Sequence, residues 1–314
     1  MAKEKRFGRR RSPQPGRVKK MRLKYIAILP SLITLMNAIC GFIAIVYASR
    51  GSSAEVLIFH LPGFTLFALS GYMIFLAMIA DVMDGRVARL SKTTSSFGGQ
   101  LDSLSDAISF GVAPAFLMMR VVGVYLERWE PSPGLGAVLN QFVFLVAIVY
   151  VVCAVVRLAR FNVENEEDES AHMNFSGLPS PAAAGVVVSL VIFQQDILPK
   201  LADHSVYLFT IIESATVWAL PVVTLGAGLL MITRVRYAHV VNHYLRGKKS
   251  FSTFIVILFA GLLLVWYIQL AMVAGFCGFA LSGLIRSAGA KMFRRKKAQS
   301  ETAPAESQEK TGAQ

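Results

Sequence analysis

The chain has 314 residues, of which 54% are hydrophobic and only 16% are charged, and its mean hydropathy is +0.54. A soluble chain of this length could not bury so much apolar surface, so the composition excludes an ordinary soluble protein and indicates an all-α integral membrane protein. The formal net charge is +13, but the basic residues flank apolar runs, which favours contact with membrane lipids and argues against a nucleic-acid partner.

The N-terminal segment, residues 1–24, is rich in Lys and Arg and also contains Pro and Gly. It precedes a long apolar run, without the short apolar core and small-residue cleavage site of a removable signal peptide. We therefore expect a solvated basic tail on the cytoplasmic side of the membrane, disordered over residues 1–20, and favour this over the alternative of a specific lipid-binding device.

Six apolar segments follow, each close to the about 20 residues that a helix needs to cross the hydrocarbon core. Their expected boundaries are 25–48, 61–83, 101–122, 136–156, 178–195 and 214–233. The sequence thus predicts a polytopic helical bundle whose six-span membrane domain occupies residues 25–249.

A further uncharged run covers residues 250–285. As a helix it would be about 54 Å long, against a hydrocarbon core of about 30 Å, so it is too long for one ordinary span and long enough for two. We expect two additional C-terminal spans within residues 250–287, which gives eight spans in all. The polar tail at 288–314 is expected to be disordered and cytoplasmic.

Basic residues on both flanks of this last run require an even number of crossings, because Lys and Arg concentrate on the cytoplasmic side. Eight spans place both termini in the cytoplasm. They leave four basic residues outside: Arg50, Arg120, Arg128 and Lys200. Glu213 lies near the outer boundary of the sixth span, where we expect a solvated or capping residue.

Four carboxylates interrupt the apolar pattern at the cytoplasmic ends of the second and third spans: Asp81, Asp84, Asp102 and Asp106. Their spacings of three and four residues place each pair on one helix face, and antiparallel neighbouring helices would bring the pairs together. Four such carboxylates cannot all stay ionised without cations. Mg²⁺ or Mn²⁺ suits them, and two ions about 4 Å apart suit phosphoryl or phosphodiester transfer.

The neighbouring residues fit that chemistry. Gly85, Ala88 and Gly98 leave a hollow on the helix surfaces, and the guanidinium of Arg89 can bind phosphate in a planar, bidentate manner. The alternative is that the carboxylates form structural ion pairs with Arg86 and Arg89, or line an ion pathway.

The combined pattern is Asp81-x-x-Asp84-Gly85-x-x-Ala88-Arg89, then eight residues, then Gly98-x-x-x-Asp102-x-x-x-Asp106. It resembles the signature of the CDP-alcohol phosphatidyltransferase family. Members of this family are membrane enzymes with a six-helix core that transfer a phosphatidyl or related group from a CDP-linked donor to an alcohol and release CMP. The resemblance therefore implies a six-helix core here, to which two C-terminal spans are added.

The resemblance also implies site roles. The metal ligands would be Asp81, Asp84, Asp102 and Asp106, with two divalent ions bound and with Asp106 acting as the catalytic general base. The CDP part of the donor would bind to Asp84, Gly85, Ala88, Arg89 and Gly98.

Other stretches, at 28–42, 105–115, 157–162 and 175–184, resemble the bacterial and archaeal phosphatidylserine synthase branch of the family. This implies the substrates CDP-diacylglycerol and L-serine, the products phosphatidylserine and CMP, a homodimer, and a prokaryotic cytoplasmic membrane. The open alternatives are another acceptor (glycerol 3-phosphate, inositol phosphate or choline) and, outside the class, a divalent-cation transporter.

Three further residues are candidates for contact with the acceptor or with phosphate. Arg157 and Arg160, at the cytoplasmic end of the fourth span, could bind the serine carboxylate, or could instead anchor the helix at the interface or bind the donor phosphate. Asn37 either faces the site or bonds a neighbouring helix; phosphatidylglycerophosphate synthases typically have Arg there.

Overall fold

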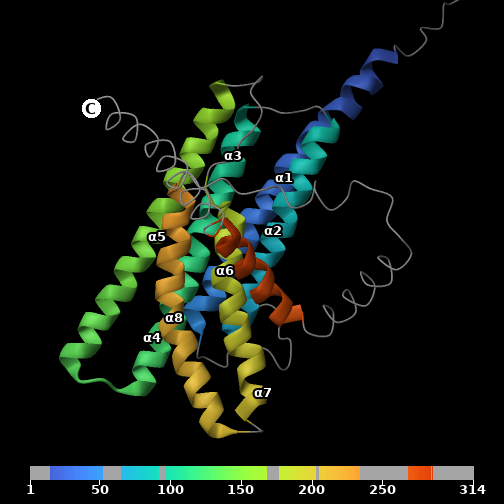
Figure 1. The fold of residues 1–314 in the computed structure, drawn as a ribbon. Helices are drawn as coiled ribbons and strands as arrows, with labels where there is room; N and C mark the ends of the chain where they lie inside the picture. The colour runs from blue at the N-terminus through green and yellow to red at the C-terminus, as the bar shows by residue number, and fades with distance from the viewer. Residues whose placement is uncertain are drawn as a thin grey trace, which may run out of the picture.

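The computed structural model describes residues 15–51, 65–91, 96–167, 177–202, 205–233, 268–283 and 285. No strand occurs in these residues, and nearly all of them are helical, as the composition predicts. The elements in chain order are α1 (Pro15–Arg50), α2 (Leu66–Ser91), α3 (Ser96–Asp106), η1 (Ala107–Val112), α4 (Ala113–Trp129), α5 (Pro133–Glu167), α6 (Ser180–Ile192), η2 (Phe193–Ile197), α7 (Leu198–Ala202) and α8 (Val206–Ile232) (Figure 1).

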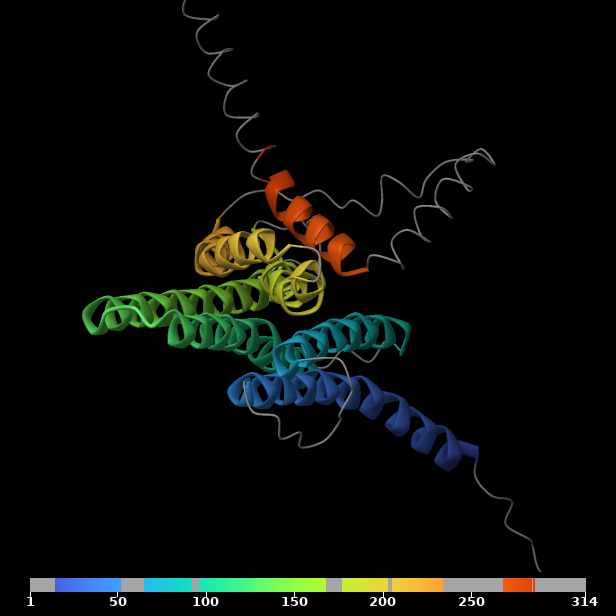
Figure 2. The ribbon, with the colours of Figure 1, turned by 90° about the horizontal axis from the view of Figure 1, so that it is seen from below.

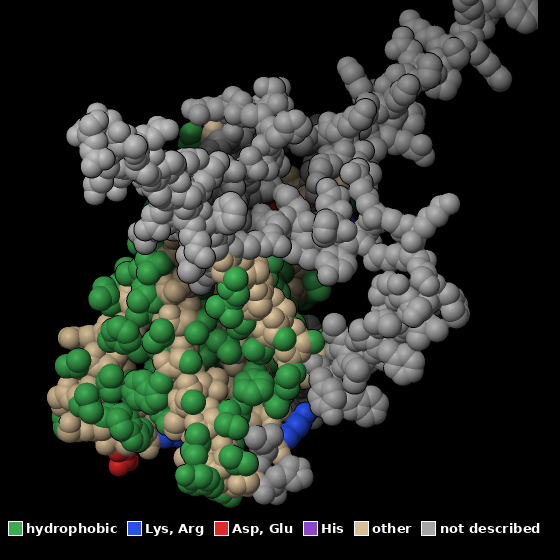
Figure 3. All heavy atoms as spheres, in the orientation of Figure 1, with side chains coloured by type: hydrophobic (Ala, Val, Ile, Leu, Met, Phe, Trp, Pro, Cys, Tyr) green, Lys and Arg blue, Asp and Glu red, His purple; other side chains and the backbone are tan. Residues whose placement is uncertain are grey.

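Within the described chain, six helical stretches are long and apolar enough to cross a membrane. They are Ser31–Arg50, Leu66–Val87, Phe97–Trp129, Pro133–Val163, Ser180–Lys200 and Val206–Ile232. Figure 3 shows apolar side chains covering the face that α5, α6 and α8 form, as expected of a surface in contact with lipid. The six spans predicted for the membrane domain are therefore confirmed, and the chain is an integral membrane protein.

The two additional spans predicted for 250–287 fall mostly outside the described residues. Of this region the structure describes Ile285 and an apolar helix, Ile268–Gly283, which is shorter than the about 20 residues of a span. The count of eight spans stays a prediction, as does the tail at 288–314. Of the N-terminal tail predicted for 1–24, residues 15–24 are not disordered but form the start of α1, and the residues before them lie outside the described part of the chain.

Small residues let α1 and α2 pack closely along their length (Figure 1). The fully buried residues include Ala44 and Ala48 in α1 and Ala77 in α2. The hydroxyl of Ser70 in α2 donates a hydrogen bond to the carbonyl oxygen of Ala44, at 2.8 Å. This contact satisfies a polar group that would otherwise lie unpaired at membrane depth.

A π-helical segment, η1, follows Asp106 directly and joins α3 to α4 in one continuous helix. Two neighbouring helices secure it: the Ser109 hydroxyl donates to the Asn37 carbonyl oxygen of α1 at 2.9 Å, and the Tyr150 hydroxyl of α5 donates to the Phe110 carbonyl oxygen at 3.1 Å. A Cβ at Gly41 of α1 would collide with Ser109, so glycine permits this close approach. Segments of π-helix occur frequently at functional sites.

The start of α6 is attached to the end of α8. Gly177 has a φ of +97°, and any Cβ there would collide with the carbonyl oxygen of Met231, so the turn requires glycine. The next residue, Leu178, donates its backbone N–H to the carbonyl oxygen of Leu230 at 3.0 Å. Ser180 then begins α6. Pro181 follows it in the first turn, where a backbone N–H would have no partner within the helix, so proline is tolerated there.

The Ile268–Gly283 helix packs on the outside of the bundle next to α6 and α8 (Figure 2). Its Phe276 ring lies directly against Gly185 of α6, where a Cβ would collide with the ring. The same ring lies 5.6 Å from the ring of Phe75 in α2, measured between centroids. The contact surface on α6 therefore depends on the absence of a side chain at one position.

Candidate active site

Three carboxylates converge where α2 approaches its C-terminal end and α3 continues into η1. Asp81, Asp102 and Asp106 each provide one oxygen, and the three oxygens lie within 4.8 Å of one another. Asp106 is buried, while Asp81 and Asp102 are partly buried. The prediction that the second and third spans bring their acidic residues together is confirmed for these three.

Asp84, the fourth predicted metal ligand, lies beside this group rather than within it. Its side chain is buried, and its Oδ2 accepts a hydrogen bond from the Thr34 hydroxyl of α1 at 2.8 Å. It is close enough to Asp102 for their charges to interact. Direct coordination by Asp84 therefore stays a prediction.

Asn37 of α1 faces the acidic cluster, which decides between the two interpretations of this residue. The side chain is fully buried, and its Nδ2 donates to Oδ1 of Asp106 at 3.0 Å. The amide oxygen of Asn37 is also buried, and it accepts no hydrogen bond from any residue that the structure describes. Asn37 thus fixes the orientation of Asp106 and presents an unused acceptor next to it.

Arg157 of α5 lies close enough to the cluster for its positive charge to interact with Asp106 and Asp81. Its Nη1 donates to the hydroxyl of Ser180 at 2.7 Å, and Ser180 is fully buried at the start of α6. Because the turn at Gly177 positions the start of α6, it also positions the Ser180 hydroxyl that this guanidinium contacts. Arg160 lies one helical turn further along α5 and is partly buried.

The predicted hollow next to the carboxylates is open at Gly85, because a Cβ placed there would meet no atom within 4 Å. Gly98 lies in the first turns of α3 and is partly buried. Ala88 and Arg89 belong to the last turns of α2, but their side chains lie outside the part of the structure that is described. Their roles at the CDP end of the donor stay predictions.

Electrostatics show why the cluster suits a cation. Two negative charges at 4.8 Å, the upper bound of the oxygen separations here, repel each other by about 3.5 kcal/mol at an effective dielectric constant of about 20. Oxygens on opposite sides of one Mg²⁺ lie about 4 Å apart, which is within this bound. One oxygen of Asp102 is buried and accepts no hydrogen bond from any described residue. These donors therefore fit a hard divalent ion.

Sequence reasoning missed two residues of this site, Thr34 and Ser180. Both are polar residues in or beside apolar spans, and Thr34 lies one turn from Asn37 on α1, so their positions offered a signal. A hydrogen bond between residues 50 positions apart, however, depends on how the helices are rotated against each other.

A further hydrogen bond, from the Ser103 hydroxyl to Oδ1 of Asn162 at 2.9 Å, links α3 to α5 at the same end of the bundle.

The fold and the site together define an integral membrane protein with an acidic centre, suited to hard cations, at one end of a helical bundle. The chain belongs to the CDP-alcohol phosphatidyltransferase family: the sequence profile of that family matches residues 27–218. This membership favours phosphatidyl transfer over the alternative of divalent-cation transport.

Relatives are similar over most of the chain. A CDP-diacylglycerol–serine O-phosphatidyltransferase of Helicobacter pylori is 30% identical over 267 residues, which are 85% of this chain and 93% of the relative. Proteins of the same name from Bacillus subtilis and Methanocaldococcus jannaschii are 29% identical over 223 residues and 32% identical over 166 residues. These alignments cover 71% and 53% of this chain, and 96% and 61% of the respective relatives.

Proposed function

We propose that this protein transfers the phosphatidyl group of CDP-diacylglycerol to the hydroxyl of L-serine, giving phosphatidylserine and CMP. The observation that carries the proposal is the convergence of Asp81, Asp102 and Asp106 in a chain of this family. The relatives named for this reaction support serine as the acceptor, since one of them aligns with 85% of the chain.

The four carboxylates are proposed to hold one or two ions of Mg²⁺ or Mn²⁺. When bound, such ions neutralise the pyrophosphate of the donor and stabilise the charge that develops on departing CMP. Asp81, Asp102 and Asp106 supply oxygens from two helices, and Thr34 orients Asp84 beside them. The buried, unpartnered oxygen of Asp102 supports this assignment.

The CDP end of the donor is proposed to occupy the open space at Gly85, with Ala88 and Gly98 leaving room for cytidine and ribose. Arg89 binds a phosphate of the donor, because its guanidinium can form two parallel hydrogen bonds with phosphate oxygens. The acyl chains remain in the bilayer, beside the apolar outer surfaces of the helices.

The acceptor serine is a zwitterion and needs partners for both charges. Arg157, which Ser180 orients toward the cluster, is proposed to bind the serine carboxylate, with Arg160 one turn further along α5. The free amide oxygen of Asn37 accepts a hydrogen bond from the serine ammonium group. Both partners lie next to Asp106, where the serine hydroxyl must react.

Asp106 is proposed as the general base. One of its oxygens accepts the hydrogen bond from Asn37, which leaves the lone pairs of the other oxygen for the serine proton. The serine oxygen forms a bond to the phosphorus on the lipid side of the donor, the bond from that phosphorus to CMP breaks, and CMP leaves. A direct displacement needs no covalent intermediate with the enzyme.

The positive-inside pattern supports a cytoplasmic location for this end of the bundle, in a prokaryotic cytoplasmic membrane with both termini inside. A homodimer is also part of the proposal and follows from family resemblance.

The decisive experiment measures CMP release by the purified protein from CDP-diacylglycerol, with L-serine, glycerol 3-phosphate, inositol phosphate or choline as acceptor. Each assay is run with EDTA, Mg²⁺ or Mn²⁺. We expect release only with serine and a divalent ion, and formation of phosphatidylserine in equal amount. Release with another alcohol but not with serine would overturn the proposed acceptor, and full activity in EDTA would overturn the proposed metal.

A further inference from the structure

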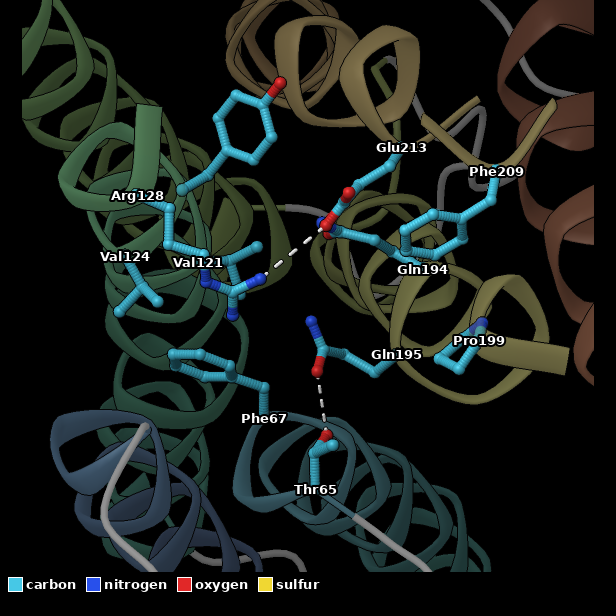
Figure 4. Close-up of a pocket in the computed structure, with 11 residues that line it drawn as sticks. Thr65, Phe67, Val121, Val124, Arg128, Gln194, Gln195, Pro199, Phe209 and Glu213 are labelled. Carbon is cyan, nitrogen blue, oxygen red and sulfur yellow. Dashed lines mark hydrogen bonds and ion pairs between the residues drawn. The ribbon is translucent and has the colours of Figure 1, made fainter. Parts of the chain in front are cut away.

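The opposite end of the bundle contains a cavity with polar and apolar lining, far from the acidic cluster along the helices. Its volume is about 170 Å³, well above the about 10–15 Å³ that admits a single water molecule. It lies between the start of α2, the end of α4, the η2–α7 segment and the start of α8 (Figure 4). No role in phosphatidyl transfer accounts for it.

Aromatic side chains beside the cavity indicate that it lies at the depth of lipid headgroups. Next to it, the rings of Trp129 and Trp218 meet edge to face with centroids 5.8 Å apart, and Tyr125, which lines the cavity, meets Trp218 at 6.4 Å. Clusters of Trp and Tyr are enriched at the membrane–water interface. The cavity therefore faces the phosphates of the leaflet on that side.

Charges of both signs face each other across the cavity. Nη1 of Arg128 lies 3.8 Å from Oε1 of Glu213, which is too long for a hydrogen bond (Figure 4). The side chain of Arg128 is 71% exposed, so this ion pair contributes little to stability and a ligand can separate it at low cost. Both groups retain hydrogen-bonding capacity for a ligand.

Two glutamines add one acceptor and one donor. Gln194 is buried, with 7% of its surface exposed, and its Oε1 accepts no hydrogen bond from any residue in the described part of the chain. Gln195 accepts a hydrogen bond from the Thr65 hydroxyl at 2.9 Å, which leaves its Nε2 pointing toward the middle of the cavity (Figure 4). An unpartnered buried acceptor is costly unless something donates to it.

We propose that this cavity binds a phosphoethanolamine group. Arg128 and Nε2 of Gln195 donate to the phosphate oxygens, while Oε1 of Gln194 and Glu213 accept from the ammonium N–H groups. The rings that line the cavity, Phe67 and Phe209, contact the ethylene carbons. The group can come from a phosphatidylethanolamine headgroup in the adjacent leaflet or from free phosphoethanolamine, which presents the same chemistry.

The test compares lipids that share a phosphate but differ in N–H groups. The protein is placed in phosphatidylcholine nanodiscs, and binding of a labelled phosphatidylethanolamine or a labelled phosphatidylcholine is titrated. Choline has no N–H to donate, so we expect phosphatidylethanolamine to bind at least about tenfold more tightly. Free phosphoethanolamine is titrated separately against the detergent-solubilised protein; binding there alone assigns the free compound, and binding of the lipid alone assigns the headgroup.

Gln194→Met removes the acceptor at nearly constant size and should abolish the preference for ethanolamine, whereas Gln194→Glu keeps an acceptor and should retain it. The matched control is Gln141→Met, on the exposed face of α5 and outside the cavity, which should not change the preference. Equal binding of the two lipids to the unmodified protein, together with no binding of free phosphoethanolamine, would overturn the proposal. So would an unchanged preference in a folded Gln194→Met variant. None of these measurements depends on CMP release, so they stand apart from the proposed transferase activity.

Discussion

The two ends of the bundle combine charged side chains in opposite ways. At the acidic end, three carboxylates of the same sign meet within 4.8 Å, and one guanidinium, Arg157, acts on them from α5. At the other end, Arg128 and Glu213 already carry opposite signs and stand 3.8 Å apart. Repulsion in a cluster of like charges is relieved by a bound cation or by protonation, whereas a pair of opposite charges needs neither. The arrangement at the acidic end therefore suits a bound ion, whereas the arrangement at the other end does not require one.

The largest effect is expected at Asp106, if the acidic end is the reactive one. Asp106→Asn removes the proposed base and should lower CMP release by about 10²–10⁴-fold, while the fold and part of the metal binding remain. The matched control is Asp196→Asn, a change of the same kind at a carboxylate that accepts a hydrogen bond from Tyr72 at 2.6 Å, outside the cluster. Near-normal turnover in Asp106→Asn would remove the assigned base.

The next largest effect is expected of a divalent ion on the free energy of unfolding. Because the ion relieves repulsion within the cluster, Mg²⁺ or Mn²⁺ at 100 times its dissociation constant should stabilise the protein by about 2.7 kcal/mol. Thermal unfolding in detergent, with and without the ion, measures this. A variant with Asp81→Asn and Asp102→Asn should lose the response and should be more stable than the unmodified protein in EDTA. An unchanged melting temperature on adding either ion to the unmodified protein would show that the cluster does not bind it.

A smaller effect is expected from the hydroxyl that holds Asp84. Thr34→Val keeps the shape of the side chain and removes the 2.8 Å hydrogen bond, so the metal concentration at half-saturation should rise about 10- to 100-fold. Thr224→Val is the matched control, since Thr224 is also buried but its hydroxyl bonds within its own helix, to the Leu220 carbonyl oxygen. Calorimetric titration with Mn²⁺ measures binding directly. Equal affinities in the two variants would argue against the positioning role of Thr34.

Ser180→Ala should have a still smaller effect, because it frees Arg157 without removing the charge. The loss of one hydrogen bond to a charged group, about 1.5 kcal/mol, corresponds to an increase in the KM for serine of about tenfold, with kcat less affected. The control is Ser189→Ala in the same helix, whose hydroxyl bonds the Val186 carbonyl oxygen. A change in kcat alone would place Arg157 at a step other than serine binding.

The smallest effect concerns the opposite end. Arg128→Gln breaks the exposed ion pair with Glu213 and should change the free energy of unfolding by less than about 1 kcal/mol. Thermal unfolding at low and high salt measures it. A loss of several kcal/mol would mean that this pair stabilises the fold, and the contrast between the two ends would then disappear.

Hydropathy and helical spacing predicted much of this molecule. Apolar runs of about 20 residues located the six spans, and intervals of three and four residues placed Asp81, Asp102 and Asp106 on facing surfaces. Both features are local, because they depend on the length and the period of one helix. The family signature added the expected roles.

The meeting of the acidic residues of two spans was predicted, and Asn37 facing the site was one of two alternatives, but the particular hydrogen bonds between helices were not predicted. The bonds from Thr34 to Asp84 and from Asn37 to Asp106 span 50 and 69 residues and require a particular rotation of α1. The pairing of Glu213 with Arg128 was not predicted either: the Glu213 side chain is 21% exposed and faces Arg128 across the cavity. Residues of other helices determine how far such a side chain is buried, and the sequence of one helix alone does not reveal which residues these are.

The contact of the Phe276 ring with Gly185 has a consequence for truncated forms of the protein. A protein shortened to end at Thr233 would retain every residue of the acidic centre but would leave a notch on the outer surface of α6, sized for an aromatic ring. Lipid tails would have to fill that notch, and they fit it less closely than the ring does. The Ile268–Gly283 helix is thus packed specifically against α6. Without this helix, the six-span core would have an incompletely packed outer surface.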